Sequence, residues 1–125
     1  MTKLAFLTAV AAALLLAPAA VAGPSIGVCN GASPAPACTD GTFTSAAGVY
    51  FMATTGGGNR DFTSVGVNCN SGYATVLTVA VPPKGTGYSQ TIHPPAGSNC
   101  TATLEKLMQG GKVQVLAGPI PFTVS

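Results

Sequence analysis

Residues 100–125, CTATLEKLMQGGKVQVLAGPIPFTVS, decide the fold of this chain. In their first part apolar and polar residues alternate, with Cys100, Ala102 and Leu104 on one side of the pattern. Because successive side chains of a strand point to opposite faces, this alternation predicts a strand whose apolar face is turned toward a core. Residues 109–112, QGGK, have the composition of a Gly-Gly hairpin turn. The sequence therefore predicts a closing β-hairpin.

The return strand of this hairpin is predicted in two pieces. Residues 113–116 run back from the turn. Residues 118–121, GPIP, are expected to bend or bulge, because proline cannot donate a hydrogen bond to a strand ladder. Residues 122–124 then resume as a last segment, which we expect at the edge of a sheet.

Further strands are expected upstream, because Gly, Pro, Thr and Ser mark turns every eight to twelve residues. The predicted strands are residues 42–45, 49–52, 62–68, 73–81 and 88–92. Residues 73–81 are apolar on both faces, with Leu77 and Val79 on one and Val76 on the other, which predicts a central position in its sheet. No segment has sustained helical periodicity, so the sequence indicates an all-β domain.

The closing hairpin, with its strand 100–104, Gly-Gly turn and final strand ending at 122–125, resembles that of immunoglobulin-like or fibronectin-type sandwich domains. The resemblance covers about the last quarter of the chain. It implies a small immunoglobulin-like antiparallel β-sandwich with two disulfides, and no particular activity. The chain departs from antibody-type domains in having no tryptophan to pack on an inter-sheet disulfide.

Residues 1–22 have the features of a secretory signal peptide. Lys3 supplies the positive start, residues 4–17 an apolar run interrupted only by Thr8, and Ala20-Val21-Ala22 a cleavage site before Gly23. We expect a secreted, extracellular domain spanning residues 23–125. Without Lys3 it carries four basic and three acidic side chains, a net charge of +1.

The four cysteines all lie in the expected mature domain, and an oxidising compartment predicts two disulfides. Three pairings are possible, and we favour Cys29–Cys38 together with Cys69–Cys100, the second tying two strands together across the core. The spacing does not suggest a metal site, because the chain has no C-x2-C pair and its one histidine is not placed to complete a zinc site. No cofactor is expected.

The low charge excludes several classes of protein. Five Lys/Arg and three Asp/Glu in 125 residues cannot form a basic nucleic-acid arm or a coiled coil, so we expect no nucleic-acid partner. Few side chains are left for acid–base catalysis. The alternative enzyme is a small secreted ribonuclease-like hydrolase, using His93, Glu105 and Arg60 together with one of the tyrosines, Tyr50, Tyr73 or Tyr88.

Binding is therefore the favoured function, as a non-enzymatic, effector-type protein that acts through loops or a sheet edge. The candidate loop tips are residues 56–60, 82–88 and 109–112, and the candidate binding residues are Arg60, Lys84 and Tyr88. The expected partner is an extracellular protein or a cell-wall glycan. A structural cell-wall or coat component that self-associates is a further alternative. Asn99-Cys100-Thr101 is a sequon, which makes Asn99 a candidate glycosylation site.

Overall fold

The computed structural model describes residues 23–31, 38 and 42–125. The predicted signal peptide, residues 1–22, lies outside these residues. The described elements are β1 (Ser25–Asn30), β2 (Thr42–Phe43), β3 (Val49–Thr54), β4 (Asp61–Cys69), β5 (Ala74–Val81), β6 (Gly87–Tyr88), β7 (Ser98–Leu107), the 3-10 turn η1 (Gln109–Gly111) and β8 (Val113–Val124). No described helix is long and apolar enough to cross a membrane.

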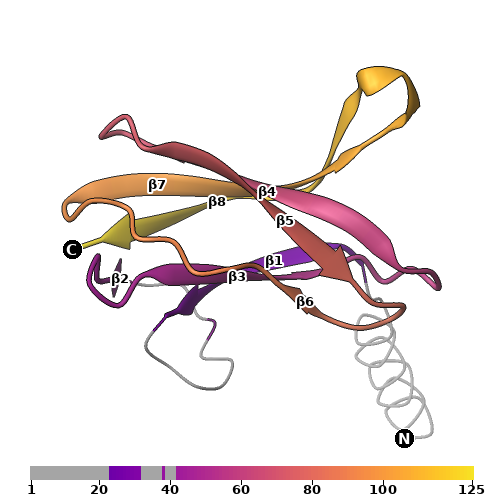
Figure 1. Cartoon of the computed structure of the whole chain (residues 1–125), viewed down its shortest axis with the longest axis horizontal. Coiled ribbons are helices and arrows are strands. Elements are labelled where there is room, and N and C mark those ends of the chain that lie inside the picture. The colour runs from indigo at the N-terminus through magenta and orange to yellow at the C-terminus, as the bar shows by residue number, and fades with distance from the viewer. Residues whose placement is uncertain (1–22, 32–37, 39–41) are drawn as a thin grey trace, which may run out of the picture.

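The strands form two facing sheets, as the sequence predicts. One sheet has the order β1-β3-β6 and the other the order β2-β8-β7-β4-β5. Figure 1 shows the two sheets as separate layers, with the smaller one below. All strand pairs are antiparallel except β2 with β8, which is parallel.

The core lies between the two sheets and is built mainly from alternate residues of β3, β4, β5 and β7, with Phe122 and Val124 from the end of β8. On β7 the buried residues include Ala102 and Leu104, and on β4 they include Val65 and Val67. Phe122 packs edge-on against Phe51, with ring centroids 5.7 Å apart. Burying each such side chain contributes roughly 1.5–3 kcal/mol, so the alternation that predicts the strands also holds the sheets together.

The closing hairpin is confirmed, with one correction at its end. β7 and β8 pair from Ser98↔Val124 to Leu107↔Val113, with register shifts near Leu104. β8 is one strand, and the expected irregularity in the proline segment is present: the pairing shifts by one residue between Ala102↔Ile120 and Leu104↔Ala117, so that Gly118 and Pro119 lie opposite Thr103. Its last residues are not at the sheet edge, because Thr123 and Val124 also pair with β2. The edge there is taken by β2, which consists of two residues only.

The prediction of a central position for residues 73–81 is wrong. β5 is the last strand of the five-stranded sheet and pairs only with β4 among the named strands. Leu77, Val79 and Val81 face the core, but Val76 on the other face is 68% exposed. The second sheet covers only one face of β5. The apolar residues on the other face are small, and such residues are common on protein surfaces.

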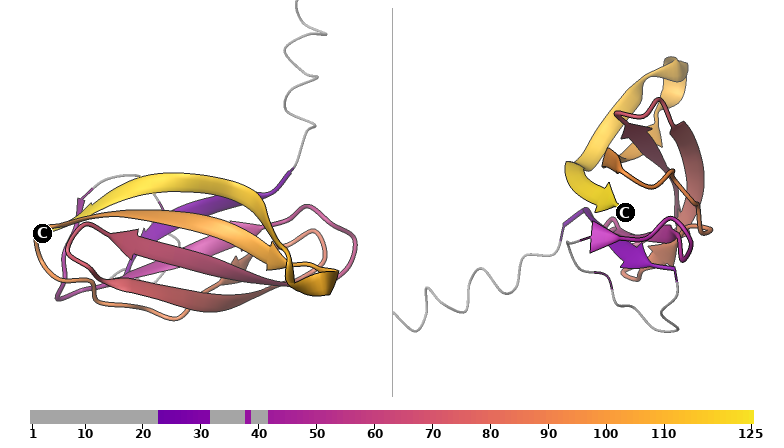
Figure 2. Two further views of the ribbon diagram at one scale, coloured as in Figure 1. Left: turned by 90° about the horizontal axis from the view of Figure 1, so that it is seen from above. Right: turned by 90° about the vertical axis from the view of Figure 1, so that its left-hand side faces the viewer.

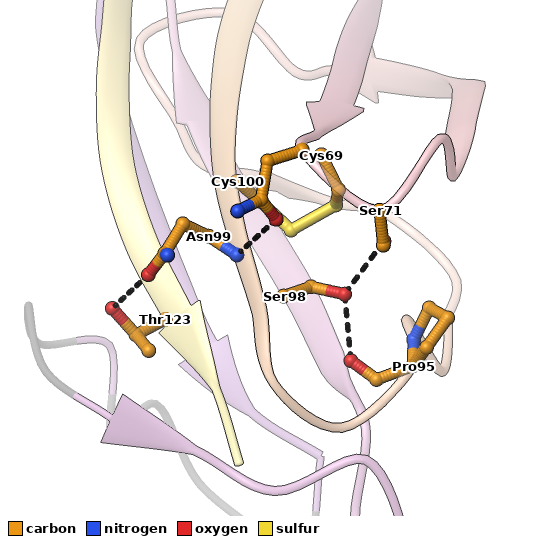
Figure 3. The surroundings of a disulfide bond; sticks show 8 residues. Cys69, Ser71, Pro95, Ser98, Asn99, Cys100 and Thr123 are labelled. Atoms are coloured by element: carbon orange, nitrogen blue, oxygen red, sulfur yellow. Dashed lines mark hydrogen bonds between the residues drawn. A yellow bond between two sulfur atoms is a disulfide. The ribbon is translucent and has the colours of Figure 1, made fainter.

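Both predicted disulfides are present, Cys29–Cys38 and Cys69–Cys100. The second does not cross the core, which corrects the expected position. Cys69 of β4 and Cys100 of β7 are direct partners in neighbouring strands of one sheet, with Cα atoms 4.0 Å apart (Figure 3). Because β4 and β7 are adjacent, this bond fixes their register and does not link the two layers.

Candidate functional site

The three loop tips predicted from the sequence lie at the same end of the sandwich. β3 ends and β4 begins there, β5 passes into β6 there, and β7 turns into β8 there. Figures 1 and 2 show these turns at the end of the long axis opposite the C-terminus. We refer to this end, with residues 55–60, 82–86 and 108–112, as the loop end.

Two of these loops are joined by a main-chain hydrogen bond. The amide of Lys84 donates to the carbonyl oxygen of Gly57 over 2.8 Å. Gly56 adopts a φ of 73°, a left-handed conformation that favours glycine. The loop after β3 and the loop after β5 are therefore held against each other, although 27 residues separate their joined positions.

The second of these loops contains a tight turn with an unusual residue. The Gly85 amide donates to the Pro82 carbonyl over 3.1 Å, and Pro83 lies at the second turn position. Lys84 follows with a φ of 51°, and it is the one non-glycine residue with positive φ in the described chain. A turn of this shape favours glycine there, so Lys84 is held in a strained conformation. Such strain is concentrated at functional sites.

The joined loops enclose an open pocket of about 350 Å³. Its lining consists of Gly23, Thr54, Gly56, Lys84, Gly85 and Thr86. One wall is fixed where β1 meets β3, because the Thr54 hydroxyl lies 2.6 Å from the Ser25 hydroxyl and donates to the Gly23 carbonyl. The lining offers glycine Cα and threonine methyl groups for apolar contact. Hydroxyls, main-chain groups and one lysine supply polar contacts.

Arg60 lies at the loop end and is exposed, beside an ion pair that it does not join. The pair links Lys106 to Asp61, with Nζ and Oδ1 2.7 Å apart. Hydrogen bonds from Lys106 and from Thr55 hold the pKa of Asp61 below its usual value of 3.8. The first residue of β4 is thereby tied both to β7 and to the loop that lines the pocket.

Tyr88, the third predicted binding residue, lies elsewhere. It is on β6, opposite Met52, and is 49% exposed on the outer face of the three-stranded sheet. Its ring packs against Tyr50, with centroids 6.1 Å apart. Tyr88 is not among the residues that line the pocket. Only Lys84 of the three predicted binding residues does so.

The residues of the alternative hydrolase are not brought together. His93 lies at the opposite end, where its Nδ1 donates to the Ser45 carbonyl over 2.9 Å and Ser45 itself bonds to Ser125. Glu105 lies on β7 opposite Ser64. The seven steps along β7 from Ser98, at its start near the His93 end, to Glu105 correspond to about 23 Å. Across the described ranges no group of three metal-ligating side chains occurs.

Asn99 is exposed near the start of β7, away from the loop end. The side-chain oxygen of Asn99 accepts a hydrogen bond from the Thr123 hydroxyl. The main-chain amide of Asn99 donates to the side-chain oxygen of Asn70 (Figure 3). Beneath it Ser98 is fully buried and bonds to Ser71 and to the Pro95 carbonyl. The sequon therefore lies on a rigid part of the surface.

Sequence reasoning missed one surface at the loop end. Four apolar side chains of the β7–β8 hairpin are exposed: Leu107 (70%), Met108 (42%), Val113 (57%) and Val115 (56%). We call these four residues the apolar tip. The alternation of β7 contains the signal for it, since Leu107 falls on the same face as Thr103 and Glu105, opposite the core residues.

No protein-family model, curated protein or solved structure matches this chain.

Proposed function

We propose that this chain is a secreted, non-enzymatic binding protein whose recognition site is the pocket between the loops after β3 and β5. The observation that carries the proposal is the bond from the Lys84 amide to the Gly57 carbonyl, which joins two loops around a pocket lined by a strained lysine. Loops fixed on a rigid sandwich are common recognition elements.

Two features support an extracellular location. Both disulfides are of the kind that persists in oxidising compartments. The sequence of residues 1–22 has the charge, apolar run and small residues of a cleaved leader.

The pocket favours a sugar ring of a cell-wall glycan as its ligand. A volume of about 350 Å³ is within the usual range for small-molecule sites. A sugar presents C–H faces and hydroxyl groups together, and the lining combines methyl and Cα groups with two threonine hydroxyls and Lys84. The absence of an aromatic ring from this lining favours recognition by hydrogen bonds over stacking.

Sedimentation with insoluble chitin, β-glucan and cellulose tests this function. We expect one of these glycans to retain the chain, and Lys84→Ala or Thr86→Val to reduce the retention at least several-fold. Lys112→Ala is the matched control, because it removes the same charge from a loop outside the pocket. Retention by none of the glycans, or equal loss in the control, contradicts a glycan site in this pocket.

The separation of His93 from Glu105 favours this proposal over a ribonuclease-like hydrolase. Incubation with RNA compares the two directly. We expect no RNA cleavage that depends on His93, measured with the unaltered chain and with His93→Ala.

Two finer assignments belong to the same proposal. The closing hairpin supports an immunoglobulin-like or fibronectin-type relationship, in which loops at one end of a sandwich serve recognition. In a eukaryotic host Asn99 would carry an N-linked glycan. The exposed position of Asn99, far from the loop end, leaves the pocket clear.

A further inference from the structure

The described strands of the three-stranded sheet do not cover the apolar tip, whose four side chains are exposed. The end of the β7–β8 hairpin rises away from the layer of β1, β3 and β6 (Figure 1). Leu107 pairs directly with Val113, and Glu105 with Val115, so these side chains share the outer face of the five-stranded sheet. The most exposed leucine of the described residues, Leu107, and Met108 therefore lie next to the turn of this projecting hairpin.

Basic side chains lie at the same end of the sandwich as this apolar surface. Every lysine and arginine of the described residues lies in the loop end or beside it: Arg60, Lys84 and Lys112 are in its loops, and Lys106 is near the end of β7. The described acids are Asp61 and Glu105, and Asp61 is paired with Lys106. Four cations against two acids leave this end with an excess charge of +2. Lys112 lies in the turn between Met108 and Val113 of the apolar tip.

We propose that the apolar tip inserts into the surface of an anionic phospholipid bilayer. Peripheral proteins bind such surfaces by burying a few apolar side chains while nearby Lys and Arg contact acidic headgroups. Phe62, 67% exposed on the outer face of β4, adds a ring to the same end. A second copy of this chain is a less favourable partner for the apolar tip, because a dimer formed through the tips would bring two positively charged ends together.

This inference does not depend on the glycan site, since none of the four residues of the apolar tip lines the pocket. The glycan proposal and the membrane proposal can therefore be contradicted independently of each other. Lys84→Ala reduces glycan retention at least several-fold if that proposal is right, and substitutions in the tip leave retention unchanged.

Vesicle flotation tests the inference with the chain as a secreting host releases it. We expect the chain to float with vesicles of phosphatidylcholine and phosphatidylserine, and far less with phosphatidylcholine alone. Leu107→Ser with Val113→Ser is expected to weaken binding at least about tenfold, because the lost apolar burial drives insertion. Lys112→Gln is expected to weaken it about fivefold.

Val76→Ser is the matched control. Val76 is as exposed as Leu107, at 68% against 70%, and lies on the outer face of the same sheet, but it is on β5 and outside the tip. Its substitution should leave vesicle binding unchanged. Equal weakening by Val76→Ser would show that binding reflects general surface stickiness and would overturn the inference.

The absence of tryptophan allows a second measurement that does not depend on loss of binding. Met108→Trp places a single indole in the tip, and its emission should shift to the blue with the mixed vesicles. Val76→Trp should show no shift. An unshifted Met108→Trp spectrum in vesicle-bound protein would overturn insertion.

Three other results would also overturn it: no flotation with either vesicle, equal flotation with both, or unchanged binding by the Leu107→Ser, Val113→Ser variant. If the chain instead forms a dimer that this variant abolishes, and does not float, the tip is an interface between copies.

Discussion

Lys84 is the residue on which the proposed site depends most. Its φ of 51° places a long side chain where the turn favours glycine. The sequence identifies Lys84 as a binding candidate by residue type alone. It cannot show the bond to Gly57, because that contact joins loops that are distant in the sequence.

Lys84→Gly should separate stability from binding. Removing the side chain relieves left-handed strain of roughly 1 kcal/mol, and the added freedom of the unfolded chain offsets part of this gain. We expect the free energy of unfolding to stay constant or rise by up to about 1 kcal/mol, while glycan retention falls. Denaturant unfolding measures the first quantity. A loss of more than about 1 kcal/mol would contradict strain at this residue.

Ser98 is a buried polar residue whose hydrogen bonds join two turns. Its hydroxyl donates to Pro95 and lies 2.8 Å from the Ser71 hydroxyl. Ser98→Ala removes both of these hydrogen bonds from a fully buried position, at about 0.5–1.5 kcal/mol each, so we expect a loss of about 1–3 kcal/mol in denaturant unfolding. Ser71→Ala, at an exposed position, is the control and should cost less. Equal effects would show that burial at Ser98 does not matter.

At the scale of elements, period-two alternation succeeds where one face of a strand is clearly polar. It correctly assigns the inner face of β7, with Cys100, Ala102 and Leu104. It fails for β5, because small apolar residues such as Ala74 and Ala80 fit a surface as well as a core. Alternation reports the faces of a strand and contains no information about its neighbours. Strand order is therefore the part of the fold that could not be predicted.

The Cys69–Cys100 bond joins two adjacent strands and closes a separation of 31 residues. In the chain-entropy model such a closure stabilises by about 3–4 kcal/mol. We expect the double variant Cys69→Ala, Cys100→Ala to lose about this much unfolding free energy and to keep its all-β circular dichroism spectrum. An unchanged midpoint in denaturant would contradict a constraining role for this bond.

At the scale of the whole molecule, charge is distributed unevenly, and the described ion pair joins β4 to β7 beside the loop end. The sequence predicts few charges and a near-neutral chain. It does not predict that the described Lys and Arg gather at one end, since they come from three separate loops and one strand. Two-sheet folding is what brings them together.

The ion pair predicts how stability responds to acid. The pKa of Asp61 is lowered in the folded chain, so its contribution is complete above the unfolded value of 3.8 and is lost as the pH falls through the folded value. The difference in melting temperature between the unaltered chain and Asp61→Asn should therefore shrink below about pH 4. Thermal melts across this range measure it. A constant difference would contradict the pair.

The central claim is that the joined loops after β3 and β5 form the recognition site. Amide chemical shifts of the isotope-labelled chain, recorded with a soluble oligosaccharide of the retained glycan, test it most directly. We predict the largest changes at residues 54–57 and 84–86. Changes centred on Tyr88, on the apolar tip or on the His93 end, with the pocket residues unmoved, would contradict the claim.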